Sequence, residues 1–194
     1  MCCCFIIYAF NWLYLAHDMN ILAAFKPIKL FVLDVDGVLT DGTLLVLNDG
    51  QMARRMNIKD GYALQLAIKK GYFILIISGG NSDAVKLRLE KLGITDLFMN
   101  VLNKKDLLIQ YAVGKNLAWT QVLYMGDDIP DLACMKMVGL ACCPSDAVHE
   151  IRAVSQYVSP ISGGNGCVRD VIEKVMKLNG DWNEDADGIT IASK

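Results

Sequence analysis

The chain has 194 residues, enough to form one domain with a core of its own. Its 19 Lys and Arg residues are balanced by 21 Asp and Glu residues, so the formal net charge is only −2. Nucleic-acid-binding proteins carry a basic excess, and we therefore expect no nucleic-acid partner.

The first 18 residues differ from the rest of the chain. Residues 1–16 are almost wholly apolar and contain no Lys or Arg. They are fewer than the roughly 20 residues of a membrane span, and they lack the positive start of a signal peptide. We expect residues 1–18 to be an extension outside the fold, residues 19–179 to form a single domain, and the polar residues 180–194 to form a loose tail. No membrane partner is expected; an anchor at residues 1–18 is the alternative.

The seven cysteines do not predict a disulfide framework. Three lie in the extension, and the other four sit in apolar or glycine-rich surroundings without CxxC spacing: Cys134, Cys142, Cys143 and Cys167. This pattern fits buried reduced thiols in a cytoplasmic protein. The histidines His17 and His149 have no Cys or His at zinc-finger spacing, so no structural zinc site is expected.

The first predicted strand, residues 30–33, is an apolar run that ends in two aspartates, Asp34 and Asp36. Such a run is typical of a buried parallel strand, and open α/β sheets bind their ligands at the carboxyl ends of their strands. Two neighbouring carboxylates repel each other unless a proton or a cation intervenes, and Mg²⁺ prefers oxygen ligands. The pattern predicts a Mg²⁺ site, with a plain aspartate-rich turn as the alternative.

A hairpin is predicted directly after this strand. Residues 44–47 and 51–58 are strand-like and flank Asn48-Asp49-Gly50, and Asp-Gly is a strong hairpin signal. An insertion at this place could cover the site, although a surface hairpin without a role has the same pattern.

The remaining elements alternate between strands and helices. We expect strands at residues 72–77, 96–101, 121–125, 138–143 and 156–158, and helices starting at residues 60, 84, 104 and 167, with two short ones ending at residue 137 and following residue 147. This alternation predicts an α/β fold with a doubly wound parallel sheet, a hairpin flap after the first strand and no large cap domain.

Further polar groups follow the later strands. Ser78, Gly79 and Gly80 end one strand and can present an O–H and backbone N–H groups to an anion. Lysine at a helix start opposes the helix dipole, so Lys104 and Lys105 stand in an unfavourable place unless one of them has a function; solvated surface lysines are the alternative.

The next strand ends in a second group of carboxylates, Asp127, Asp128 and Asp131. Because parallel strands end at one edge of a sheet, these groups should meet Asp34 and Asp36. The ordered motifs DVDGVLTDG, SGG, a lysine and GDDIPD resemble the haloacid dehalogenase superfamily of phosphotransferases. The resemblance runs from about residue 29 to residue 177.

Two further motifs narrow the resemblance. YMGDDIPDL, and GGNGCVRDV at residues 163–171, are similar to the small, mostly capless 3-deoxy-D-manno-octulosonate 8-phosphate (KDO 8-phosphate) phosphatases. The resemblance implies Mg²⁺-dependent hydrolysis of a sugar-acid phosphate through an aspartyl-phosphate. It also implies a homotetramer in which hairpins from four subunits pack together.

The resemblance assigns roles to individual residues. Asp34 would be the nucleophile, and Asp36 the acid and then the base. Asp34, Asp127 and the backbone carbonyl of Asp36 would hold the metal. Ser78 and Gly79 would bind phosphoryl oxygens.

The same resemblance covers the remaining site residues. Lys104 would neutralise charge on the transferring group, with Asp131 orienting this lysine or the metal shell. Arg169, and less strongly Arg88, are candidates for binding the sugar acid. Many members carry an arginine where this chain has Gly80, which makes the sugar end of the substrate less secure than the phosphoryl chemistry.

Three other functions share parts of this pattern. A phosphatase for a nine-carbon keto sugar acid 9-phosphate needs the same site. A receiver-like phosphoacceptor domain also uses Asp, Mg²⁺, a hydroxyl and Lys, but it has no need of an acid/base at Asp36. A non-catalytic assembly domain has no need of the motif residues.

Overall fold

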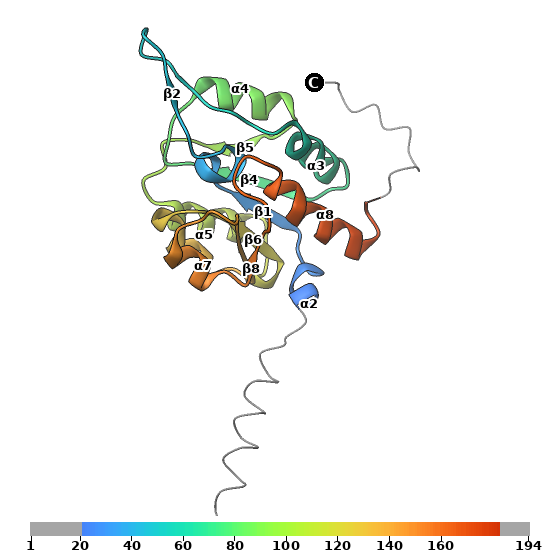
Figure 1. The fold of residues 1–194 in the computed structure, drawn as a ribbon. Helices are drawn as coiled ribbons and strands as arrows, with labels where there is room; N and C mark the ends of the chain where they lie inside the picture. Colours follow the sequence, from blue (N-terminus) through green and yellow to red (C-terminus); the bar gives the residue numbers. More distant parts are fainter. Residues whose placement is uncertain (1–20, 183–194) are drawn as a thin grey trace, which may run out of the picture.

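The computed structural model describes residues 21–182, so the extension predicted at residues 1–18 and residues 183–194 of the predicted tail lie outside the described part. The fold is built on a six-stranded parallel sheet with the order β5-β4-β1-β6-β7-β8 (Figure 1). The strands are β1 (Leu30–Leu33), β4 (Phe73–Ile77), β5 (Asp96–Phe98), β6 (Val122–Met125), β7 (Leu140–Cys143) and β8 (Tyr157–Val158). The predicted α/β doubly wound fold is confirmed.

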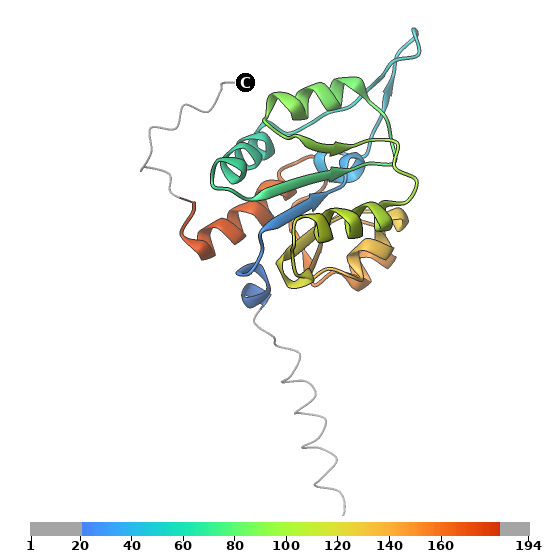
Figure 2. The same ribbon diagram turned by 180° about the vertical axis from the view of Figure 1, so that it is seen from behind.

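Helices cover both faces of the sheet (Figures 1 and 2). One face packs against α2 (Ile21–Phe25), α3 (Ile58–Lys69), α4 (Asp83–Lys91) and α8 (Cys167–Asn179). The other packs against α5 (Lys104–Gly114), α6 (Leu132–Met135) and α7 (His149–Val154). Successive side chains of a strand point to opposite faces, so Phe31 and Leu33 enter the first core cluster and Leu30 and Val32 the second. This burial on both sides explains the unbroken apolar run of β1.

Several element bounds differ from the predicted ones. The strand expected at residues 96–101 ends at Phe98, because Asn100 turns the chain with a φ of 57°. The helix expected from Asp60 begins at Ile58, because the Asn57 side chain caps it by accepting from the Lys59 N–H. Ser82 caps α4 by accepting from the Val85 N–H.

The predicted hairpin is present as a separate antiparallel ribbon of β2 (Leu45–Val46) and β3 (Met52–Ala53). Figure 1 shows it extending away from the body of the domain. Within residues 21–182 this ribbon is the main insertion between β1 and α3, and the described chain contains no large cap domain. None of the helices in that range is long and apolar enough to cross a bilayer.

The end of the described chain packs against the domain. The Trp182 side chain is 8% exposed, belongs to the first core cluster, and meets the Tyr62 ring edge-on at 5.9 Å between centroids. The core therefore extends past residue 179, where the sequence placed the end of the domain. The four described cysteines are buried free thiols, as predicted.

Candidate active site

The site begins where β1 ends. Asp34 is buried directly after Leu33, and its Oδ1 accepts a 2.7 Å hydrogen bond from the Val35 N–H. The chain then turns at Gly37, which has a φ of 83°. A Cβ at Gly37 would lie 2.0 Å from Asp127 Oδ2. Glycine is therefore required here both by its backbone conformation and by the close approach of a carboxylate from the neighbouring strand.

The neighbouring strands deliver the other predicted groups to the same edge. In the sheet, Leu33 pairs with Ile76 of β4 on one side and with Met125 of β6 on the other. Ser78 follows β4, is buried, and accepts a 3.1 Å hydrogen bond from the Gly80 N–H through its Oγ. Asp127 follows β6.

Lys104 is the central cation. Although it starts α5, its side chain is only 5% exposed, and its Nζ lies 2.8 Å from Asp34 Oδ2 and 2.8 Å from Asp131 Oδ1. Asp131 also accepts a 2.7 Å hydrogen bond from the Tyr124 hydroxyl. Lys105 is exposed, whereas Lys104 is the candidate lysine that pairs with the carboxylates of Asp34 and Asp131. Burial disfavours the charged lysine, but Asp131 and Asp34 outweigh that effect and raise the pKa of Lys104 above its usual value.

Three carboxylates surround this single ammonium group. Oxygen atoms of Asp34, Asp127 and Asp131 lie within 4.8 Å of one another. Burial, together with the charge of Asp131, raises the pKa of Asp34 to about 7 against the opposing effect of Lys104. Burial and the charges of Asp34 and Asp131 raise the pKa of Asp127 to about 7.

The cluster fits a divalent cation. Asp127 Oδ1 is one of the buried side-chain oxygens in residues 21–182 that have no hydrogen-bond partner. Burying an unpaired carboxylate oxygen is costly, and the one ammonium group paired in this cluster faces three carboxylates. Oxygen-rich clusters of this kind suit Mg²⁺, and Asp34, Asp127 and Asp131 are the side chains here that could hold such an ion.

Asp36 has a different environment. Its carboxylate is not part of the three-carboxylate cluster but faces the hairpin, where Arg54 Nε lies 2.6 Å from Asp36 Oδ1. Sequence reasoning missed Arg54. Its only signal was a position in the return strand of a hairpin suspected of covering the site, and the adjacent Arg55 has the same signal.

The two arginines proposed for the sugar acid make contacts with other parts of the chain. The Arg169 Nε is 3.0 Å from Glu173 Oε2, and its guanidinium lies over the rings of Tyr62 and Trp182. Arg88 lies beside α3, where a Cβ at Gly61 would come within 3.1 Å of its guanidinium. In the described part of the chain, neither arginine has an ion pair or hydrogen bond with the carboxylate cluster.

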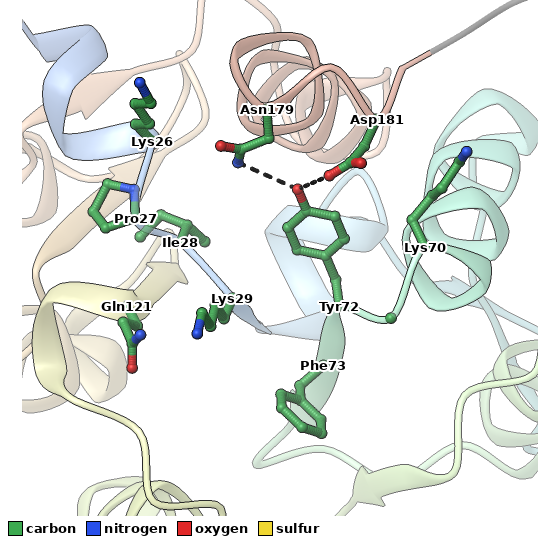
Figure 3. A pocket seen from close by; sticks show the side chains of 11 residues that line it. Lys26, Pro27, Ile28, Lys29, Lys70, Tyr72, Phe73, Gln121, Asn179 and Asp181 are labelled. Carbon is green, nitrogen blue, oxygen red and sulfur yellow. Dashed lines mark hydrogen bonds between the residues drawn. The ribbon is translucent and has the colours of Figure 1, made fainter.

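A separate cavity of about 420 Å³ lies at the opposite edge of the sheet (Figure 3). Residues preceding β1, β4 and β6 line it, and the Tyr72 hydroxyl there donates to Asp181 at 2.6 Å and accepts from Asn179 at 3.3 Å. Because the carboxylates follow the same strands at their other ends, this cavity is not part of the candidate active site.

Known proteins similar to this chain carry one name repeatedly. No protein-family model matches it. The chain is 34% identical over 169 residues to the 3-deoxy-D-manno-octulosonate 8-phosphate phosphatase KdsC of Escherichia coli K12. The aligned region covers 85% of this chain and 88% of that protein.

Solved structures agree with that similarity. The 3-deoxy-D-manno-octulosonate 8-phosphate phosphatase of Yersinia pestis superposes with a TM-score of 0.83 and 30% identity over 88% of this chain and 92% of that one. The Moraxella catarrhalis enzyme, solved with magnesium, phosphate and KDO, has a TM-score of 0.81 and 32% identity, and the match covers 86% of this chain and 95% of that one. The chain therefore belongs to the 3-deoxy-D-manno-octulosonate 8-phosphate phosphatase family of the haloacid dehalogenase superfamily.

Proposed function

We propose that this chain hydrolyses 3-deoxy-D-manno-octulosonate 8-phosphate to 3-deoxy-D-manno-octulosonate and phosphate, with Mg²⁺ as its cofactor. The observation that carries the proposal is the contact of Lys104 with Asp34 inside a cluster of three carboxylates at the carboxyl end of β1. The names of the similar proteins, and the magnesium, phosphate and KDO in the Moraxella catarrhalis structure, support the same reaction.

The reaction divides into two transfers at phosphorus. In the first, an oxygen of Asp34 attacks phosphorus, the bond to the sugar oxygen breaks, and Asp36 gives that oxygen a proton. In the second, Asp36 takes a proton from water, the water oxygen attacks the aspartyl-phosphate, and phosphate leaves with Asp34 restored. Bound Mg²⁺ would supply positive charge next to the phosphoryl oxygens.

The remaining site residues stabilise the group in transfer. The Lys104 ammonium, held between Asp34 and Asp131, is placed to neutralise charge on the phosphoryl oxygens. The Ser78 hydroxyl and the Gly79 N–H, at the end of β4, are the proposed donors to the same oxygens. Arg169 and Arg88 stay candidates for binding the sugar acid, although neither side chain contacts the carboxylate cluster in the described part of the chain.

A phosphate-release assay over a panel of sugar phosphates, with and without Mg²⁺, tests the proposal. We expect the 8-phosphate of the eight-carbon keto acid to be the best substrate, and the Asp34→Asn variant to be inactive but folded, because an amide cannot form the acyl phosphate. Preference for a nine-carbon keto acid 9-phosphate would favour the alternative leaving group. Wild-type activity in Asp34→Asn would contradict the mechanism.

The receiver-like alternative predicts a different outcome. A phosphoacceptor domain would take up phosphate on Asp34 without rapid turnover. The proposed acid and base role of Asp36 predicts turnover, and membership of a phosphatase family favours it. The same membership disfavours a non-catalytic assembly domain.

We also propose that the protein is a cytoplasmic homotetramer built around the hairpin. Five of the hairpin side chains are large, apolar and exposed: Leu44, Leu45, Val46, Leu47 and Met52. A two-stranded ribbon is marginally stable alone, and an exposed apolar surface of this kind is typical of an interface. The free buried thiols fit a reducing compartment. Light scattering at micromolar concentration tests the assembly, and a monomer would contradict it.

A further inference from the structure

One arginine reaches the candidate active site from the hairpin. Arg54 follows β3, and its guanidinium makes a bidentate contact with the carboxylate of Asp36. Nε lies 2.6 Å from Oδ1, and Nη2 lies 3.3 Å from Oδ2. The Arg54 side chain is only 8% exposed, although Leu45 and Met52 on the same ribbon are exposed. A two-pronged contact of this kind fixes the plane of the carboxylate as well as its position.

The loop after β4 leaves room for this pair. A Cβ at Gly80 would lie 2.9 Å from Asp36 Oδ2 and 3.6 Å from Arg54 Nη2, and 3.5 Å from Ser78 Oγ. The ion pair therefore lies against the main chain of the loop that carries Ser78, a proposed phosphate ligand. A side chain at position 80 would compete with the carboxylate for the same space.

Asp36 has little else to hold it. Its carboxylate side chain is 40% exposed, and its other hydrogen bond among the described residues is a long one, 3.5 Å, from the Thr40 hydroxyl. Without Arg54, the carboxylate would rotate among several staggered conformations. A general acid must stay within hydrogen-bond reach of the atom that it protonates.

We infer that Arg54 is a positioning residue, which aims the Asp36 carboxylate at the leaving oxygen of the substrate. The inference rests on the proposed function, in which Asp36 protonates that oxygen. It gives the hairpin a second task, because the ribbon that carries the exposed apolar surface also fixes the proposed acid. Arg54 itself neither receives nor gives a proton.

Leaving groups of different basicity test the inference. A sugar alkoxide needs a proton as it leaves, whereas p-nitrophenolate leaves without one. With enzyme in excess, release of the leaving group in a single turnover reports only the first transfer. For Arg54→Gln we expect sugar release to slow by roughly tenfold to a hundredfold, the range of a misplaced catalytic group, and p-nitrophenolate release to change by less than about threefold.

Arg55 supplies the matched control. It is the next residue, its side chain is 71% exposed, and it pairs with Asp41 at 2.9 Å rather than with Asp36. Arg55→Gln should release both leaving groups at the wild-type rate. Arg54→Lys keeps the charge but not the two-pronged contact, so its sugar release should lie between those of wild type and Arg54→Gln.

Asp36→Asn separates failure of the inference from failure of the proposed function. If Asp36→Asn slows sugar release selectively and Arg54→Gln slows both leaving groups equally, or neither, the inference is overturned. If Asp36→Asn shows no selectivity, the acid role of Asp36 fails first. Light scattering and thermal melts establish that each variant keeps its assembly and fold. Should Arg54→Gln not fold, Arg54→Lys decides by the same comparison of leaving groups.

Discussion

The ammonium nitrogen of Lys104 lies 2.8 Å from a carboxylate oxygen of Asp34, although Lys104 starts α5 and Asp34 follows β1. Both side chains are buried, so their attraction is weakly screened by solvent. The contact places the ammonium group that is proposed to neutralise the phosphoryl oxygens directly beside the proposed nucleophile. It also explains why a lysine occupies the start of a helix, where it opposes the helix dipole.

Replacing Lys104 should therefore damage both activity and stability. For Lys104→Ala we expect a loss of roughly a hundredfold or more in kcat, comparable to removal of an oxyanion donor. Two buried carboxylates would also lose their partner, at a cost of about 3–5 kcal/mol in the free energy of unfolding. Steady-state kinetics and urea titrations measure the two effects. Lys105→Ala is the control, since Lys105 is exposed and its loss should change neither value; a larger loss at Lys105 would refute the assignment.

Mg²⁺ should stabilise the fold as well as support turnover. A ligand that binds only the folded state at a hundredfold excess over its Kd adds about 2.7 kcal/mol, or on the order of 5–10 °C in Tm for a domain of this size. The buried, unpartnered Asp127 Oδ1 is a ligand atom in this account. Asp127→Asn should melt higher than wild type without metal and gain much less from Mg²⁺. An equal gain in both proteins would remove Asp127 from the metal site, and activity that survives EDTA would contradict the cofactor.

The sequence predicts three members of the carboxylate cluster, Asp34, Asp127 and Asp131, because strand ends are a topological feature, whereas Asp36 and Asp128, which were expected with them, lie outside the cluster. Asp34, Ser78 and Asp127 each follow an apolar run, and parallel strands in neighbouring positions end at one edge. Lys104 could be recognised because it violates a local rule of helix starts. These signals need no knowledge of side-chain packing.

Arg54 could not be predicted in the same way. Its contact with Asp36 depends on the angle at which the hairpin leaves the sheet, and no residue period encodes that angle. Arg169 stays a prediction: a family-like position suggested a role in binding the sugar acid, and in the described structure its side chain pairs with Glu173 and lies over Trp182. The burial of Trp182 depends on tertiary packing, which the polar composition of the tail conceals.

Asp60 should make stability depend on pH. This residue of α3 is buried; its Oδ1 accepts a 2.7 Å hydrogen bond from the Arg169 N–H, and its Oδ2 has no partner. Burial raises the pKa of Asp60 from 3.8 to about 6, against the opposing effects of the Arg169 N–H and guanidinium. The folded state then holds this proton more tightly than the unfolded state does. The contribution of the protonated Asp60 to the free energy of unfolding is therefore complete below pH 3.8 and is lost as pH rises through about 6.

The Asp60→Asn variant isolates this contribution. Relative to the variant, wild type should lose up to about 3 kcal/mol of unfolding free energy between pH 4 and 7. Urea titrations of both proteins across that range give the difference between their free energies of unfolding. The effects of protonating Asp34 and Asp127 are common to both proteins and cancel in this difference. A difference that does not vary with pH would show that Asp60 has an ordinary pKa.

Charges on the hairpin should separate the subunits. The side chains of Leu45 and Leu47 are 64% and 41% exposed on a ribbon that extends away from the domain (Figure 1). In the proposed tetramer they are buried between subunits, so the double change Leu45→Asp and Leu47→Asp would bury unpaired charges and favour dissociation. Because neither side chain belongs to the core of the described domain, the monomer should keep its fold, which circular dichroism would show.

Dissociation should affect substrates unequally. If neighbouring subunits help to enclose the sugar, the monomeric variant should lose most of its activity toward the sugar phosphate and less toward a small aryl phosphate, which needs no enclosure. Light scattering and kinetics on the same samples measure both properties. A monomeric variant that is fully active on the sugar phosphate would show that subunits do not complete one another's sites. Wild-type assembly in the variant would place the interface elsewhere on the molecule.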